Sequence, residues 1–102
     1  MRLIVFFDLP TETSKDKKNY RLFRKFLQKE GYLMQQLSVY SKLEINDNAA
    51  KADIHRLRQN KPPSGSVQLL KVTEKQFADI EYICGSKQSE DKVDSIDDIV
   101  VI

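Results

Sequence analysis

The sequence predicts an α+β fold in which two helices pack on one face of a four-stranded antiparallel sheet. Three observations lead to this prediction. A short apolar run lies at 2–8, an amphipathic segment with a basic face follows at 14–30, and the predicted elements come in the order strand, helix, strand, strand, helix, strand. This order is that of the ferredoxin-like (βαββαβ) sandwich, also called the split βαβ arrangement.

The first strand is predicted at 2–8, RLIVFFD, because this run is apolar, β-branched and too short for a helix. Thr13 or Ser14 can cap the next helix by accepting hydrogen bonds from its free amides. Residues spaced by about 100° place the apolar and basic side chains of 14–30 on opposite arcs. The apolar arc holds Tyr20, Leu22, Phe23, Phe26 and Leu27. Gly31 is predicted to end the helix.

Residues 32–45 are rich in strand formers but exceed the length of an average strand. We therefore predict two strands with a bend or bulge at 37–38. Asn46 or Asp47 is predicted to cap a second helix that extends to Asn60. The narrow apolar face of that helix consists of Ala50, Ile54 and Leu57.

The fourth strand is predicted at 66–72, after the segment KPPSG ends the second helix. Thr73, with Gln76 three residues later, is a capping-box pattern that predicts a short third helix. Residues 81–84 fit a brief edge strand, and Cys84 fits a small buried apolar residue.

We expect a ferredoxin-like domain at 1–84, followed at 85–102 by an acidic loop and an additional C-terminal strand. Two helices cover only one face of the sheet, so the other face and the apolar end of the chain need a partner. A homodimer that packs two sheets face to face and pairs the terminal strands would cover both. The predicted dimer or partner interface is Ile99, Val100, Val101 and Ile102.

The composition restricts the class of protein. A chain of 102 residues with 40% hydrophobic residues forms one modest core. No apolar run approaches the roughly 20 residues of a membrane span, so we expect no signal peptide, transmembrane helix or membrane partner. A single cysteine forms no internal disulfide and no Cys-X-X-Cys zinc site, so we expect a cytoplasmic location.

The net charge of +2 hides an uneven distribution. Residues 14–30 carry seven basic and two acidic side chains, whereas 86–102 carry two basic and five acidic ones. A lysine or arginine that meets a DNA phosphate adds affinity that does not depend on base sequence. A solvated helix face is the alternative interpretation. The predicted nucleic-acid-binding residues are Lys15, Lys17, Lys18, Arg21, Arg24, Lys25, Arg56 and Arg58.

Four stretches together resemble a known family, the small CRISPR-associated protein of spacer acquisition that is the lesser partner of the integrase. They are LIVFFDLPTET, FRKFLQKEGY, QLSVYSKL and LLKVTEKQF, and the resemblance extends from Leu3 to about Cys84. The segments DLPT, YRLFRKFL and SVYSKL look like the form that accompanies type II systems. The order and spacing of these stretches are more specific than any one of them.

The resemblance implies a ferredoxin-like homodimer with two kinds of activity. One is architectural, because in the family the dimer bridges two integrase dimers and holds duplex protospacer DNA before its insertion into the repeat array. The other is a magnesium-dependent endonuclease that cleaves single-stranded RNA or duplex DNA. The aspartate that ends the first strand, here Asp8, is then the metal-binding and catalytic residue. The resemblance also implies that the C-terminal end crosses to the partner subunit and meets the integrase.

Asp8 follows five apolar residues, where a strand end can present a carboxylate at the edge of the sheet. Mg²⁺, or another divalent cation in its place, prefers oxygen ligands and keeps several waters, so one carboxylate per chain holds it loosely. Near a dimer axis, Asp8 and its mate could share one metal whose bound water is the nucleophile. The alternative is that Asp8 caps the loop that follows.

Other catalytic groups are less evident. Met34 and Gln35 stand where the resemblance leads us to expect a basic strand residue, although Arg21 could substitute from the helix. This departure weakens the expectation of nuclease turnover. Ser38 and Tyr40 match serine and aromatic positions of the family and are candidates for the same cleft. A bend residue and a core aromatic residue are the alternative interpretations.

Three functions remain at this point. The first is a DNA-bridging subunit of the spacer integration complex, and the second is a metal-dependent nuclease that acts on RNA or DNA. The third, a module that binds single-stranded RNA, would display a basic-glycine-aromatic signature on a central strand, and VQLLKVT lacks it. The sequence favours the bridging subunit and leaves open whether the protein is an enzyme.

Overall fold

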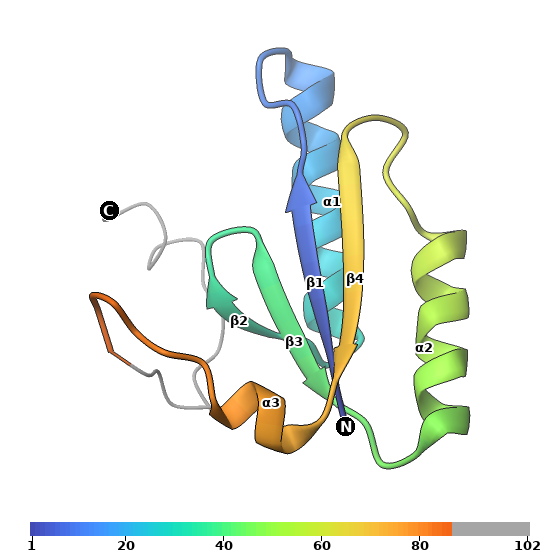
Figure 1. Cartoon of the computed structure of the whole chain (residues 1–102). Coiled ribbons are helices and arrows are strands. Elements are labelled where there is room, and N and C mark those ends of the chain that lie inside the picture. The colour runs from blue at the N-terminus through green and yellow to red at the C-terminus, as the bar shows by residue number, and fades with distance from the viewer. Residues whose placement is uncertain (87–102) are drawn as a thin grey trace.

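The structure, a computed structural model, describes residues 1–86 and shows a mixed α+β fold (Figure 1). A single antiparallel sheet has the strand order β2-β3-β1-β4. The predicted ferredoxin-like class is confirmed by this sheet and by the order of the elements. They are β1 (Arg2–Asp8), α1 (Ser14–Lys29), β2 (Leu33–Gln36), β3 (Val39–Leu43), α2 (Asp47–Gln59), β4 (Ser66–Val72) and α3 (Glu74–Ala78).

The helices begin at the capping residues that the sequence predicts. The Thr13 hydroxyl accepts a hydrogen bond from the Asp16 amide at 3.0 Å, and the Asp16 carboxylate accepts one from the Thr13 amide. Thr73 and Gln76 form the same reciprocal box at the start of α3. The Asn46 side chain accepts from the third residue of α2 at 2.8 Å. Each cap satisfies amides that the first helical turn leaves unpaired.

The predicted bend between the second and third strands lies at Ser38. This residue has a φ of +65°, a left-handed conformation that is uncommon for residues with a side chain. The pairing register of β2 and β3 shifts between Met34 and Gln36. Together, the shift and the turn let the two short strands form a hairpin next to β1.

The core lies between the sheet and the helices. Leu3, Val5 and Phe7 alternate along β1 and point to this side. Phe7 is at the centre of an aromatic cluster, with its ring edge-on to Phe23 of α1 at 5.2 Å and stacked on Tyr40 of β3 at 5.6 Å. This cluster fixes the C-terminal end of β1.

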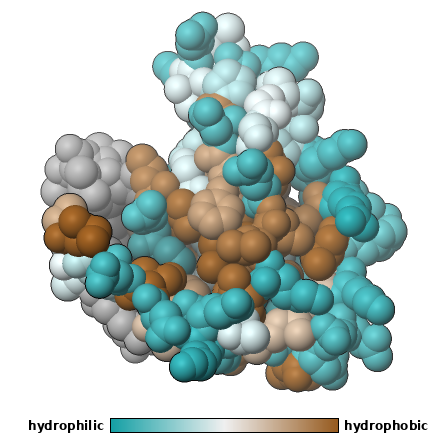
Figure 2. Space-filling model, viewed as in Figure 1, coloured by the Kyte–Doolittle hydropathy of each residue, from teal (hydrophilic) through white to brown (hydrophobic). Residues whose placement is uncertain are grey.

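The opposite face of the sheet is largely open and apolar (Figure 2). The exposed large apolar side chains of this face and of the segment after α3 include Leu70, Ile80, Tyr82 and Ile83. β4 is one of the two edge strands and pairs only with β1, and six of its seven residues are exposed. Patches of this kind usually mark an interaction surface.

Arg2 anchors α3 to the end of the sheet. Its guanidinium donates to both carboxylate oxygens of Glu74, at 3.0 and 2.8 Å, and lies 4.1 Å from the centre of the Phe77 ring. Two parallel hydrogen bonds to a carboxylate and a cation–π contact are interactions for which arginine is well suited. The anchor fixes the point from which the chain continues beyond α3.

Three expectations about packing are corrected by the structure. Residues 81–84 form no strand, and Cys84 is exposed, because the segment after α3 does not join the sheet. Leu22 is 54% exposed and does not belong to the buried side of α1, which consists of Phe23, Arg24 and Leu27. The predicted C-terminal strand, with its four interface residues, lies outside the described residues. No helix within 1–86 is long and apolar enough to span a membrane.

Candidate nucleic-acid interface and metal site

Asp8 is the last residue of β1, and its side chain is exposed. It pairs in register with Ser66, the first residue of β4. The turn before β4 packs closely here, because a Cβ on Gly65 would lie 2.7 Å from the Asp8 carbonyl oxygen and 2.8 Å from a Leu9 methyl carbon. The backbone of Asp8 is thus held by the Gly65 turn on one side and by the buried Phe7 ring on the other.

Ser38 lies beside the same end of β1. Its carbonyl oxygen accepts a hydrogen bond from the Phe7 amide at 3.0 Å, and its hydroxyl is 3.5 Å from the Tyr20 hydroxyl of α1. Two hydroxyl groups therefore lie near the strand end that carries Asp8. Sequence reasoning assigned Tyr20 only to the apolar arc, because helical spacing says nothing about what a hydroxyl meets on another element.

Tyr40 has a different environment from Ser38. Its side chain is 1% exposed and stacks on Phe7 within the core. The structure therefore makes it a core aromatic residue and not the lining of an open cleft. Burial against Phe7 explains why an aromatic residue is suited to this position.

The first turns of α1 extend beyond the sheet at the end where β1 stops (Figure 1). This helix has six exposed cations, of which Lys29 lies in the last turn. The other five, here named the α1 basic face, are Lys15, Lys17, Lys18, Arg21 and Lys25. Lys17, Arg21 and Lys25 are each four residues apart and so form a line along the helix. The N-terminal end of α1 is the positive end of its helix dipole, and Lys15, Lys17 and Lys18 lie at this end. The dipole adds to the positive potential that a phosphate would meet there.

Arg24 does not belong to the α1 basic face, although the helical spacing predicts it there. The residue is 8% exposed and lies on the buried side of α1 with Phe23 and Leu27. A long side chain can bury its aliphatic stem against apolar neighbours in this position. Arg24 also lines a small pocket with Arg21, Lys25 and Gln28, and its contact with phosphate stays a prediction.

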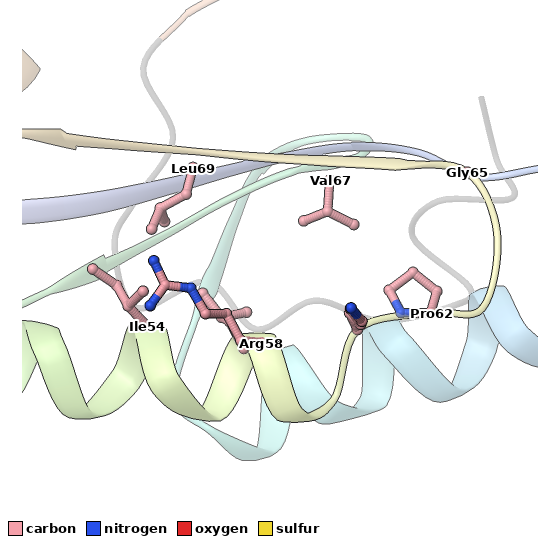
Figure 3. Close-up of a pocket in the computed structure, with 8 residues that line it drawn as sticks. Ile54, Arg58, Pro62, Gly65, Val67 and Leu69 are labelled. Atoms are coloured by element: carbon pink, nitrogen blue, oxygen red, sulfur yellow. The ribbon is translucent and has the colours of Figure 1, made fainter.

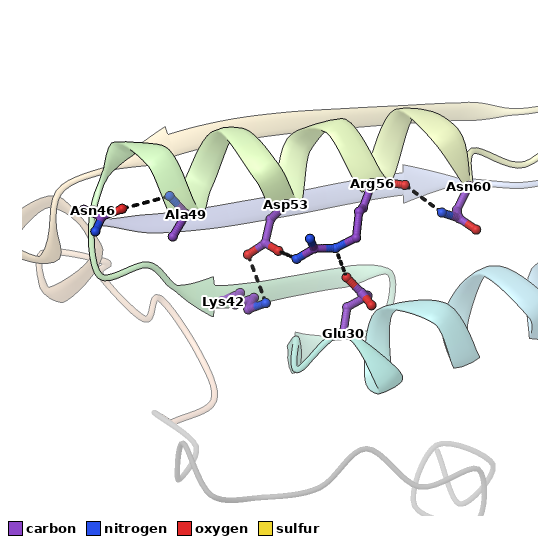
Figure 4. A network of polar contacts seen from close by, with 7 residues as sticks. All are labelled: Glu30, Lys42, Asn46, Ala49, Asp53, Arg56 and Asn60. Atoms are coloured by element: carbon purple, nitrogen blue, oxygen red, sulfur yellow. Dashed lines mark hydrogen bonds and ion pairs between the residues drawn. The ribbon is translucent and has the colours of Figure 1, made fainter.

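Arg56 is the centre of an ion-pair network (Figure 4). It donates to Glu30 at the C-terminal end of α1, at 2.5 Å, and to Asp53 one turn earlier on α2. Lys42 of β3 pairs with the other oxygen of Asp53 at 2.9 Å. Arg56 is thus ion-paired although its side chain is 45% exposed, and its contact with nucleic acid stays a prediction. Its position connects α1 to α2.

Arg58 lies in an open groove between α2 and β4 (Figure 3). The groove has a volume of about 330 Å³, and its apolar walls come from both elements. Arg58 and Lys61 are its two charged lining residues. Its lining residues are Ile54, Leu57, Arg58, Lys61, Pro62, Gly65, Val67 and Leu69.

The described residues of one protomer do not form a complete metal site. Among residues 1–86, no group of three or more His, Cys, Asp or Glu side chains is placed to hold a metal ion. Asp8 contributes one exposed carboxylate, and Mg²⁺ requires a set of oxygen ligands in octahedral geometry. A second Asp8 or the oxygens of a bound phosphodiester would have to supply what one chain lacks.

Comparisons with a family model and with individual known proteins indicate the same family. The family model of CRISPR associated protein Cas2 matches residues 1–80. A "CRISPR-associated endoribonuclease Cas2" of Streptococcus mutans serotype c is 52% identical over 89 residues, which cover 87% of this chain and 82% of the relative. Proteins of the same name from Treponema denticola and Acidovorax ebreus are 50% and 46% identical, over 88% and 83% of this chain and 89% and 83% of the relatives.

Proposed function

Because the chain belongs to the CRISPR-associated Cas2 family, we propose that it acts in spacer acquisition as a homodimer that binds duplex DNA and bridges integrase dimers. The α1 basic face is the observation that carries this proposal. Its five cations are exposed and lie on one helix, whose first turns extend beyond the sheet. Such a surface meets phosphates of the protospacer or repeat duplex through charge and shape.

The proposed binding is independent of base sequence. A single line of lysine and arginine side chains along α1 suits successive phosphates of one groove edge. None of the described helices has the features of a recognition helix that enters the major groove. We therefore assign selection of the DNA to its length and shape and to the integrase.

The open face of the sheet supports the homodimer. Large apolar side chains are exposed on this face and after α3, and a second copy would cover them without any further element. Light scattering of the full chain should give twice the chain mass of 11.9 kDa. Deletion of residues 96–102 should shift the mass towards that of one chain. A mass of one chain for the intact protein at micromolar concentration would refute the dimer.

The alternative function is a magnesium-dependent endonuclease that cleaves single-stranded RNA or duplex DNA at Asp8. It is favoured by the exposed carboxylate at the end of β1 and by the endoribonuclease names of the relatives. A divalent cation, when bound, supplies Lewis acidity and an activated water. Asp8 of each protomer would be one ligand, the α1 basic face would hold the nucleic acid, and the Ser38 and Tyr20 hydroxyls would contact the phosphodiester.

A charge reversal on α1 tests the proposed DNA contact. We expect Lys17→Glu together with Arg21→Glu to weaken binding to a duplex of about 30 base pairs at least tenfold at low salt, because two phosphate contacts per chain are lost. The slope of log K against log salt should become shallower by about two per chain. Fluorescence anisotropy over a series of salt concentrations measures both quantities.

The matched control is Lys71→Glu together with Lys75→Glu. This pair changes the formal charge by the same amount on exposed residues of β4 and α3, away from α1. The affinity of this control variant for the duplex should fall only by the small amount that the change in net charge alone explains. Equal losses in the two variants would show that the α1 basic face is not the binding surface, and the proposed contact would be wrong.

A further inference from the structure

A cluster of charged and polar groups is buried where β3, α2 and the end of α1 meet. Asp53 of α2 is 4% exposed, and Glu44, which follows β3, is 5% exposed. Tyr32 comes from the segment after α1 and is also buried. The cations that face these groups are Lys42 and Arg56, and Glu30 completes the set. The cluster is separate from Asp8 and from the α1 basic face.

The cluster has one carboxyl group more than it has cations. Lys42 is bound to Asp53, and Arg56 is shared between Asp53 and Glu30. Glu44 is left with a hydrogen bond to Asp53, and its second oxygen, Oε2, is buried without a partner. A carboxylate buried beside another carboxylate, with no cation of its own, is costly, whereas a neutral carboxylic acid can donate to its neighbour.

From this arrangement we propose that Glu44 is protonated in the folded protein below neutral pH and donates its proton to Asp53, and that ionisation of Glu44 weakens the docking of α2. The hydrogen bond then runs from the Glu44 hydroxyl to an Asp53 oxygen. With Glu44 neutral, the two cations balance Asp53 and Glu30. With Glu44 ionised, an uncompensated negative charge lies under α2.

α2 depends on this cluster because its apolar contact is small. The fully buried residues of the helix are Ala50, Asp53 and Leu57, so one of the three is the charged residue at the centre of the cluster. On the other side of α2, the open groove separates it from β4. The ion pairs to Glu30 and Lys42 are therefore a large part of what holds α2 on the rest of the fold (Figure 4).

The electrostatic surroundings agree with this proton assignment. Burial, the hydrogen bond to Asp53 and the negative charge of Asp53 raise the pKa of Glu44 to about 7, against the opposing charges of Lys42 and Arg56. Burial opposes ionisation of Asp53, but hydrogen bonds from Glu44 and Lys42 hold the pKa of Asp53 below its usual range. Burial and the nearby carboxylates raise the pKa of Tyr32, so the phenol stays neutral.

The direction of the pH effect follows from proton linkage. The pKa of Glu44 is about 7 in the folded chain and 4.5 in a model compound, so the folded state holds a proton that the unfolded state releases between these values. The contribution of Glu44 to the free energy of unfolding is therefore largest below about pH 4.5 and decreases as the pH rises to about 7.

Thermal unfolding of the full chain between pH 5 and pH 8 tests the proposal. We expect the midpoint of the parent protein to fall by about 5 °C or more over this range. Glu44→Gln, which keeps the donor to Asp53 and cannot ionise, should match the parent near pH 5, exceed it near pH 8 and lose most of the slope. If Glu44→Gln keeps the slope of the parent, the proposal is overturned.

Glu74→Gln is the matched control. Arg2 lowers the pKa of Glu74, so this carboxyl is ionised throughout the range. Its replacement should lower the midpoint at both ends of the range and keep most of the slope of the parent. Should Glu44→Gln fail to fold, the carboxyl ¹³C shift of Glu44 in the parent gives its titration directly, and a midpoint below pH 5 overturns the assignment.

Hydrogen exchange separates loosening of α2 from a general loss of stability. After correction for the intrinsic rates, exchange of the amides at 53–59 should increase at least about threefold from pH 6 to pH 8 relative to those at 23–29 of α1. Glu44→Gln should abolish the difference. An equal increase in both helices would contradict the part of the proposal that concerns α2.

Discussion

Replacement of Asp8 by alanine is expected to lower divalent-dependent cleavage of single-stranded RNA and duplex DNA by about 100-fold or more, while integration with the partner integrase is retained. The expected size is that of a lost group that stabilises charge in the transition state. Asp8 is exposed at the end of β1, so its removal leaves the core unchanged. Parallel assays of cleavage with and without Mg²⁺, and of spacer integration, measure the two activities.

Glu12→Ala is the matched control for Asp8. Glu12 is exposed and lies in the short connection that follows Asp8 and leads to α1, so the change removes the same charge nearby. Its cleavage rate should stay within about twofold of the parent, since exposed charges act weakly at this distance. Two results would remove the nuclease alternative. One is a parent protein without divalent-dependent cleavage, and the other is an Asp8→Ala variant that still cleaves at the parent rate.

The second large effect is expected for Gly65→Ala, which should destabilise the fold by about 3 kcal/mol. A φ of +90° costs a residue with a Cβ about 1–2 kcal/mol. The new Cβ would also lie 2.7 Å from the Asp8 carbonyl oxygen, and relief of such a clash in packed structure costs about 1–3 kcal/mol more. Urea denaturation followed by circular dichroism measures the free energy of unfolding.

Gly31→Ala provides the comparison that isolates the clash. Gly31 has a φ of +93°, but the nearest atom to its added Cβ is 3.7 Å away and belongs to the flexible Lys42 side chain. The strain of the backbone is thus the same and the clash is absent, so we expect a loss of only about 1 kcal/mol. Equal losses at the two glycines would show that the turn before β4 can move away from Asp8.

The local signals of the fold could be predicted from the sequence. Thr13, Asn46 and Thr73 cap the helices as expected, because a capping side chain bonds only to amides within its own turn. The bend at Ser38 was also predicted, since the segment was too long for one strand. The exposure of Cys84 was not predicted, because the environment of this residue depends on whether another segment packs over it.

The residues of the candidate site also differ in whether the sequence alone could place them. Asp8 could be placed at a strand end from the apolar run before it alone. The burial of Arg24 and the pairing of Arg56 with Glu30 could not be predicted, because they depend on which other element lies against each helix. Periodicity gives the angle of a side chain on its helix but does not identify its neighbours. The contact of Tyr20 with Ser38 was missed for the same reason.

The exposure of β4 has a consequence for how this protein is measured. A strand that pairs with one neighbour and leaves six of its seven residues exposed gains little stability within its own chain. In the proposed homodimer, a second copy that covers the open face of the sheet adds stability by mass action, so the unfolding midpoint rises with protein concentration. Variants of this chain are therefore comparable only at equal concentration, and dilution alone should mimic a destabilising substitution.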